Sequence, residues 1–180
     1  MTTQKVLYIE DKRLRQKANK VRDFSPALQT LAQDMLETMR CYEGVGLAGP
    51  QIGVMQRIFV AEILAPQQDE AAQPPSSVNY VLINPKIIRT SKNLIEGKEG
   101  CLSIPHWAGL VDRPAWVEVT AQDVTGQPFK LRADDLLARI FQHEIDHLNG
   151  VLYIDYITEP KKLWRTDAET GSDGSKNKIL

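Results

Sequence analysis

The run DDLLARIFQHEIDHL, from Asp134 to Leu148, decides how the rest of this chain is interpreted. Its apolar residues recur at three- and four-residue steps, which predicts one helix that begins after Asp134 and stops at Gly150. Within it lies the motif HEIDH, His143–His147. A helix has about 3.6 residues per turn, so the two histidines of the motif lie on the same face.

Two imidazoles four residues apart can bind a single metal ion, and a glutamate between them can move protons beside it. The chain has only three histidines, and two of them belong to this motif. A five-residue match also arises by chance, because helical histidines often serve only in packing. The motif alone therefore leaves a metal site and a structural role about equally open, with a metal-dependent hydrolase as the hypothesis to test.

A catalytic site needs a third ligand, and the sequence places it upstream. Zinc proteases with this motif take a ligand downstream, but no histidine follows His147, and Glu159 lies beyond the stop of the helix. Cys101 is the upstream candidate, although a free cysteine is often only a small buried hydrophobe. Two histidines and one thiolate with an open fourth position are typical of catalytic sites. His106 is a competing ligand that we expect to face solvent.

Composition excludes several classes of protein. The 180 residues are 42% hydrophobic and 25% charged, with a net charge of −1, which gives no electrostatic footprint for nucleic acid. No apolar run is long enough to cross a bilayer, and the first residues lack the pattern of a secretory signal. Only Cys41 and Cys101 are present, so we expect a reduced, cytoplasmic protein. We expect one catalytic domain over residues 1–158 and a polar, partly disordered tail over 159–180.

The remaining elements predict an α+β fold, with antiparallel sheets packed around the C-terminal helix and a second helix near the N-terminus. That second helix spans Ser25 to Tyr42, with Ser25 as its N-cap and Pro26 in its first turn. Expected strands cover residues 57–64, 78–90, 115–121 and 128–132, the second of them bent at Asn84-Pro85. We expect residues 151–157 to pack back on the core.

The run GVGLAG, Gly44–Gly49, matches the glycine fingerprint of dinucleotide-binding proteins. That fingerprint must follow a strand and begin a helix, whereas this run follows a helix, so the dinucleotide interpretation is rejected. Glycines also let an extended peptide approach the backbone closely, and this is the use that we expect here.

Three motifs in this order, Gly44–Gln51, Glu99–Ser103 and Gln142–His147, resemble the signature motifs of the peptide deformylases. The similarity extends from Leu14 to about Ile157. It implies a metallohydrolase that removes the N-formyl group from the formyl-methionine of newly synthesised polypeptides and releases formate. It further implies a monomer whose partners are formyl-methionyl nascent peptides at the ribosome exit, with no direct contact to nucleic acid or membrane.

The resemblance assigns the metal to Cys101, His143 and His147, with one Fe²⁺ per chain and Ni²⁺, Co²⁺ or Zn²⁺ in preparations. The ligands by themselves would suggest zinc, so the choice of iron depends wholly on the family. Glu144 matches the general base, which takes a proton from the attacking water and passes one to the departing amine.

The other family positions surround this centre. Gln51 and the backbone N–H of Leu102 match the donors that stabilise the tetrahedral oxyanion. Substrate contacts fall on Val45, Gly46, Gly100 and Ile140, the last expected to line the methionine pocket. Arg113 is expected to pair with Glu99 and so fix the loop that carries Cys101.

Two positions depart from the family pattern: Gly49 stands where most members have Ala, and Ala108 stands where many have Arg. Two rival functions stay open. One is a zinc peptidase that cleaves internal bonds, and the other is a binding protein that has lost its activity. The intact Gln51 and Glu144 argue against the second, because an inactive scaffold has no need of a general base.

Overall fold

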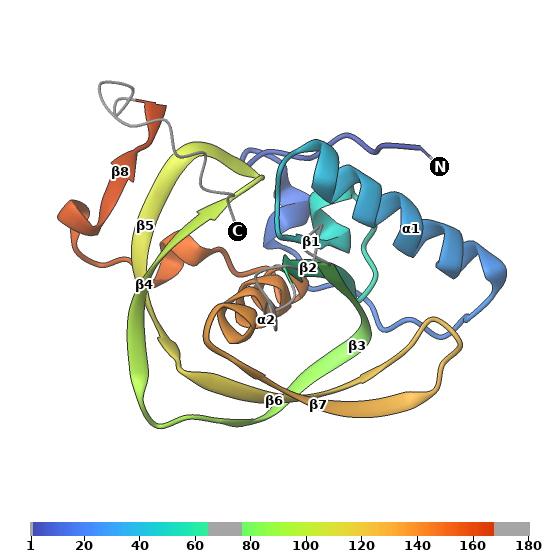
Figure 1. The fold of residues 1–180 in the computed structure, drawn as a ribbon. Helices are drawn as coiled ribbons and strands as arrows, with labels where there is room; N and C mark the ends of the chain where they lie inside the picture. Colours follow the sequence, from blue (N-terminus) through green and yellow to red (C-terminus); the bar gives the residue numbers. More distant parts are fainter. Residues whose placement is uncertain (1, 65–76, 168–180) are drawn as a thin grey trace, which may run out of the picture.

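The structure is a computed structural model that describes residues 2–64 and 77–167. Within these ranges the chain forms two antiparallel β-sheets and two α-helices, which confirms the predicted α+β class. Helix α2 (Asp135–Leu148) lies between the two sheets, and helix α1 (Pro26–Cys41) covers the outside of the larger one (Figure 1).

Helix α2 follows from its sequence. Asp134 is the N-cap, as predicted, and the chain leaves the helix through Gly150, whose φ of +76° is one that glycine adopts readily. Its apolar side chains enter the core between the sheets. Phe141 is fully buried there and makes edge-to-face contacts with Phe59 and Tyr80, at centroid distances of 5.4 and 5.5 Å. The helix is thereby held on the face opposite its histidines.

The larger sheet has the strand order β1-β2-β3-β6-β7, with all neighbouring strands antiparallel. Its strands are β1 (Gly46–Ala48), β2 (Ile58–Leu64), β3 (Ser77–Thr90), β6 (Trp116–Gln122) and β7 (Pro128–Asp134). The predicted bend in the second strand is present, because the register of β3 against β6 shifts between Ile83 and Lys86 and Asn84 has a φ of +52°.

The smaller sheet brings the middle of the chain against α2. Strands β4 (Leu94–Cys101) and β5 (Ile104–Pro114) form a hairpin, and the short β8 (Leu163–Arg165) pairs with β5. The sequence did not predict β4 and β5 as a hairpin, because their glycines and alternating charges obscure the strand pattern. Cys101 is the last residue of β4, directly before the turn.

Helix α1 begins at Pro26 after the predicted N-cap Ser25, but the Ser25 hydroxyl bonds Asp23 rather than the helix. Four 3-10 turns complete the described chain: η1 (Lys12–Arg15), η2 (Gly49–Ile52), η3 (Tyr153–Tyr156) and η4 (Pro160–Lys162). Leu152 and Tyr153 are buried, so residues 151–157 pack on the core as expected.

The tail expected over residues 159–180 divides into two parts. Its first part contains η4 and β8, neither of which the sequence predicted, while residues 168–180 lie outside the described chain. None of the described helices is long and apolar enough to cross a membrane.

Candidate metal centre

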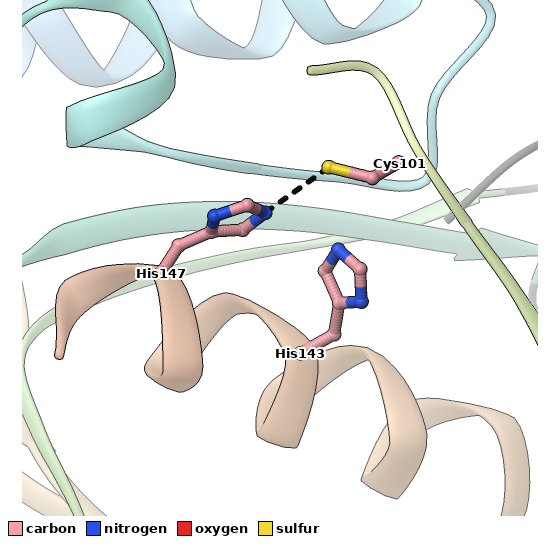
Figure 2. Close-up of side chains that lie close together, drawn as sticks. All are labelled: Cys101, His143 and His147. Carbon is pink, nitrogen blue, oxygen red and sulfur yellow. Dashed lines mark hydrogen bonds between the residues drawn. The ribbon is translucent and has the colours of Figure 1, made fainter. Parts of the chain in front are cut away.

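Two elements far apart in the sequence bring three metal-binding side chains together. His143 and His147 project from one face of α2, and Cys101 approaches them from the end of β4 (Figure 2). The Cys101 Sγ lies 3.2 Å from the His147 Nε2, and the ligand atoms of all three residues lie within 4.8 Å of one another. All three side chains are buried. The upstream ligand proposed from the sequence is therefore adjacent to the histidine pair.

The donor set fits a metal ion. The His143 Nε2 is buried and has no hydrogen-bond partner among the described residues, although buried polar atoms rarely stay unpaired. A thiolate and two imidazoles are ligands that zinc and iron accept, and three protein ligands leave a coordination position for substrate or water. The site has the composition of a catalytic rather than a structural metal centre.

The two histidines differ in their surroundings. Burial lowers the pKa of His147 well below its ordinary value and keeps the imidazole neutral, which is the form that binds a metal. Burial also opposes protonation of His143, but the nearby Cys101 and the hydrogen bond between its Nδ1 and Glu99 raise its pKa well above the ordinary value. A metal ion bound at the His143 Nε2 would therefore take the place of a proton.

A buried carboxylate orients His143. The His143 Nδ1 lies 3.0 Å from the Glu99 Oε2, and Arg113 donates from Nε to the Glu99 Oε1 at 2.9 Å and from Nη2 to Oε2 at 3.0 Å. Burial alone would raise the pKa of Glu99, but the bonds to His143 and Arg113 outweigh it and lower the pKa far below the ordinary value. The ionised carboxylate thus fixes the ring with its Nε2 free for a metal.

Glu144 lies in the same turn of α2 as the histidines and is buried. Burial raises the pKa of its carboxyl to about 7, so this group can both accept and donate a proton near neutral pH. A Cβ at Gly46 would collide with the Glu144 carboxylate. The glycine of β1 is therefore what lets this strand pass directly over the carboxylate.

Gln51 and Leu102 lie beside Cys101. The Gln51 Oε1 accepts a hydrogen bond from the Ala48 N–H at 2.7 Å, which turns the amide nitrogen toward the Cys101 Sγ at 3.5 Å. Leu102 follows Cys101 in the turn between β4 and β5. Gln51 thus offers a side-chain donor next to the Cys101 sulfur, and Leu102 is the residue directly after it in the chain.

The other predicted site residues are distributed as follows. Gly100 is buried in β4 opposite Ala108, and Val45 precedes β1, where its carbonyl accepts from the Glu62 N–H at 2.9 Å. Ile140 is fully buried in the core cluster that contains Phe141, on the side of α2 that faces the larger sheet. His106 is exposed, as expected.

Two residues beside the centre were not predicted from the sequence. The Arg139 Nη1 donates to the Glu99 Oε1 at 2.8 Å, and the Tyr153 ring stacks on His143 at a centroid distance of 6.0 Å. The position of Arg139 four residues before His143 was the available signal, because such residues share a helix face. No sequence signal marks Tyr153, whose place depends on how the chain folds back after α2.

Comparison with known proteins gives one consistent family. A model of the polypeptide deformylase family matches residues 3–163. The peptide deformylase of Thermomicrobium roseum is 44% identical over 163 residues, which cover 91% of this chain and 90% of that protein. The peptide deformylase of Rhizobium meliloti is 43% identical over 162 residues, which cover 90% and 89%.

Solved structures agree with these sequence matches. A peptide deformylase from Synechococcus elongatus, crystallised in complex with actinonin, is similar with a TM-score of 0.77 and 41% identity, over 88% of this chain and 81% of that one. A plant peptide deformylase is similar with a TM-score of 0.80 and 36% identity, over 93% and 85%.

Proposed function

Since this chain belongs to the polypeptide deformylase family, we propose how its own residues carry out the reaction of that family. The chain is a metallohydrolase that removes the formyl group from N-terminal formylmethionine. The observation that carries the proposal is the convergence of Cys101, His143 and His147 beside the buried Glu144.

Cys101, His143 and His147 would hold the metal. A metal ion in this position supplies Lewis acidity, which polarises the formyl carbonyl and acidifies water. The family favours Fe²⁺, and a thiolate with two imidazoles is compatible with iron as well as zinc. Glu99, itself held by Arg113, keeps the His143 ring turned toward the metal position.

Glu144 is the proposed general base and acid. With a pKa of about 7, its carboxylate can take the proton of the attacking water and, once protonated, return it to the departing amine. Its Oε2 is buried without a hydrogen-bond partner among the described residues, so the carboxylate is available for proton transfer. Gly46 keeps the space beside it free of a side chain.

Gln51 and the backbone N–H of Leu102 are the proposed donors to the oxyanion that forms on the formyl oxygen. The bond from the Ala48 N–H holds the Gln51 amide in place before the reaction begins, and such preorganised donors are the ones that accelerate it. The loss of one donor of this kind costs on the order of 10²–10³ in rate.

The substrate backbone is proposed to pair with Val45 and Gly46 on one side and Gly100 on the other, as an added strand. Ile140 is proposed to contribute to the methionine pocket from α2. Ala108 lies opposite Gly100 in the hairpin, so this chain offers no charged side chain at that position to hold the peptide.

We also propose that the chain is a monomer and acts on nascent peptides as they leave the ribosome. Relatives occur in bacteria and in a plant, which fits the cytoplasm or an organelle. The near-neutral charge gives no reason to expect direct binding to nucleic acid.

One anaerobic preparation tests the proposal. We expect stoichiometric iron together with formate release from formyl-Met-Ala and no cleavage of the Met-Ala bond. Cleavage of the peptide bond without formate release would support the rival zinc peptidase. Formate release by protein that holds a different metal would reject the assignment of iron but not the assignment of the deformylase reaction.

A further inference from the structure

Arg139 is a buried cation that the roles proposed above leave unused. Its side chain is 10% exposed and lies one helical turn before His143, between α2 and the β4–β5 hairpin. The guanidinium donates from Nη2 to the Ile95 carbonyl at 2.6 Å and from Nη1 to the Val111 carbonyl at 2.9 Å. It is therefore fixed by the backbones of both strands of the hairpin.

The space for this guanidinium comes from Gly97. A Cβ on Gly97 would lie 2.7 Å from both the Cζ and the Nη2 of Arg139, closer than real Cβ contacts allow. Because the hydrogen bonds to β4 and β5 hold the guanidinium firmly, it could not move aside without breaking them. The guanidinium of Arg139 therefore needs a residue without a side chain at position 97.

The Arg139 Nη1 also donates to the Glu99 Oε1 at 2.8 Å, and this bond completes the set around the carboxylate. Oε1 accepts from Arg113 and Arg139, and Oε2 lies within bonding distance of Arg113 and His143. A carboxylate offers about four lone-pair sites, and these four contacts use all of them. Without Arg139, the Glu99 Oε1 would keep only one of its two donors, Arg113.

We propose that Arg139, seated against Gly97, is a positioning residue for the metal centre: it immobilises Glu99 and, through it, the His143 imidazole. The inference rests on the proposed Cys101, His143 and His147 centre. Partners that orient a metal-bound histidine typically contribute about 10- to 100-fold to metal affinity or activity. A purely structural Arg139 would instead affect unfolding and leave the metal affinity of the folded protein unchanged.

The test measures Ni²⁺ affinity by competition with a chelator, on folded protein, for the wild type, R139Q, G97A and the double variant. We expect R139Q and G97A each to weaken Ni²⁺ binding by about 10- to 100-fold. The double variant should bind no more weakly than R139Q, because the methyl group added at position 97 then has no guanidinium to displace. R139K, which keeps one charged donor, should recover part of the affinity.

The matched control is Gln142→Met. Gln142 also joins α2 to β5, through a bond from its Nε2 to the Pro114 carbonyl at 3.2 Å, and the same nitrogen also donates to the Ala138 carbonyl rather than to Glu99. It should lower the melting temperature and keep the Ni²⁺ affinity. Wild-type affinity in folded R139Q or G97A, or independent losses that add in the double variant, would overturn the inference. Absence of Ni²⁺ binding by the wild type would instead reject the proposed centre itself.

Discussion

At the scale of single residues, the centre depends on where each ionisable group is buried. Two carboxylates and two guanidiniums form one group, in which Arg113 joins the buried Glu99 to the half-buried Asp146 and Arg139 also binds Glu99. Each of the two carboxylates is therefore paired with at least one guanidinium. Among the residues that the structure describes, no such cation is bonded to Glu144, and its raised pKa follows from burial. Glu99 on β4 is thus held ionised, whereas the carboxyl of Glu144 on α2 has a pKa of about 7.

Glu144→Gln should retain the metal and lose turnover. The amide keeps the shape of the side chain but cannot accept the proton of the attacking water, so we expect kcat to fall by about 10²–10⁴. Formate release and metal content measured on the same sample check this. The exposed Glu10→Gln is the control, and near-normal kcat in Glu144→Gln would exclude the general-base role.

The two cysteines make a matched pair of variants. Cys101→Ala removes a proposed ligand and should abolish tight metal binding, whereas Cys41→Ala removes an exposed thiol on α1 and should not change it. Elemental analysis after gel filtration distinguishes them. One metal ion per chain, retained in Cys101→Ala, would remove Cys101 from the ligand set.

At the scale of elements, α2 is placed by its packing rather than by its caps. Asp134 makes no side-chain hydrogen bond to the helix, whereas most residues of α2 are buried. The helix therefore keeps its angle to the hairpin, and its histidines their distance from Cys101, through contacts on the opposite face.

Phe141→Ala should destabilise the protein by about 3–5 kcal/mol, because it removes a fully buried ring from between the helix and the larger sheet. Leu136, on the same helix and 55% exposed, is the control, and Leu136→Ala should change stability by less than about 0.5 kcal/mol. Urea unfolding of both variants measures the difference. Equal losses would show that packing on this face does not hold the helix.

The turn between β6 and β7 should make the stability of the folded protein depend on pH. The Asp123 Oδ1 accepts from the Thr125 hydroxyl at 2.6 Å and from the Thr125 and Gln127 N–H groups at 2.8 and 3.0 Å, and these bonds lower the pKa of Asp123 below 3.8. A lowered pKa in the folded chain means that the unfolded chain binds the proton more readily. The stabilisation by Asp123 is therefore fully present at pH values above its ordinary pKa of 3.8. It is lost as the pH falls through the lower pKa of the folded chain.

Asp123→Ala should accordingly lower the melting temperature at about pH 7 by more than it does at about pH 2. Thermal unfolding of the wild type and the variant across this range measures the gap between them. A gap that stays constant, or widens in acid, would show that the ionised carboxylate does not stabilise the turn.

At the scale of the whole molecule, the metal site connects the two sheets. Its proposed ligands come from β4 in one sheet and from the helix packed on the other, so metal binding would stabilise their association. A ligand that binds only the folded state stabilises it by about 4 kcal/mol at roughly 1,000 times its dissociation constant. We expect chelation to lower the melting temperature of the wild type but not of Cys101→Ala, measured by calorimetry with and without chelator.

The sequence predicted what depends on local periodicity and missed what depends on tertiary contact. The regular apolar spacing of α1 and α2 identified both helices, and alternation identified β6. Cys101 was found by elimination and by its motif, because nothing local shows that β4 and β5 pair in the register that brings it to His147. Arg139 was missed because an arginine on a helix usually faces solvent, and its burial depends on contacts with β4 and β5 that the sequence does not show.

The shortness of β1 has a consequence for how copies of this chain meet one another. Unpaired strand edges that accept an extended peptide can equally accept the edge of a second copy, which is a route to aggregation. Strand β1 has only three residues and is followed at once by η2 with its Pro50, so it offers too little edge for a stable pairing between copies. A short peptide end could occupy this edge, as proposed for the substrate, whereas a folded neighbour would gain little from it, so the same short strand would favour chain termini and oppose self-association.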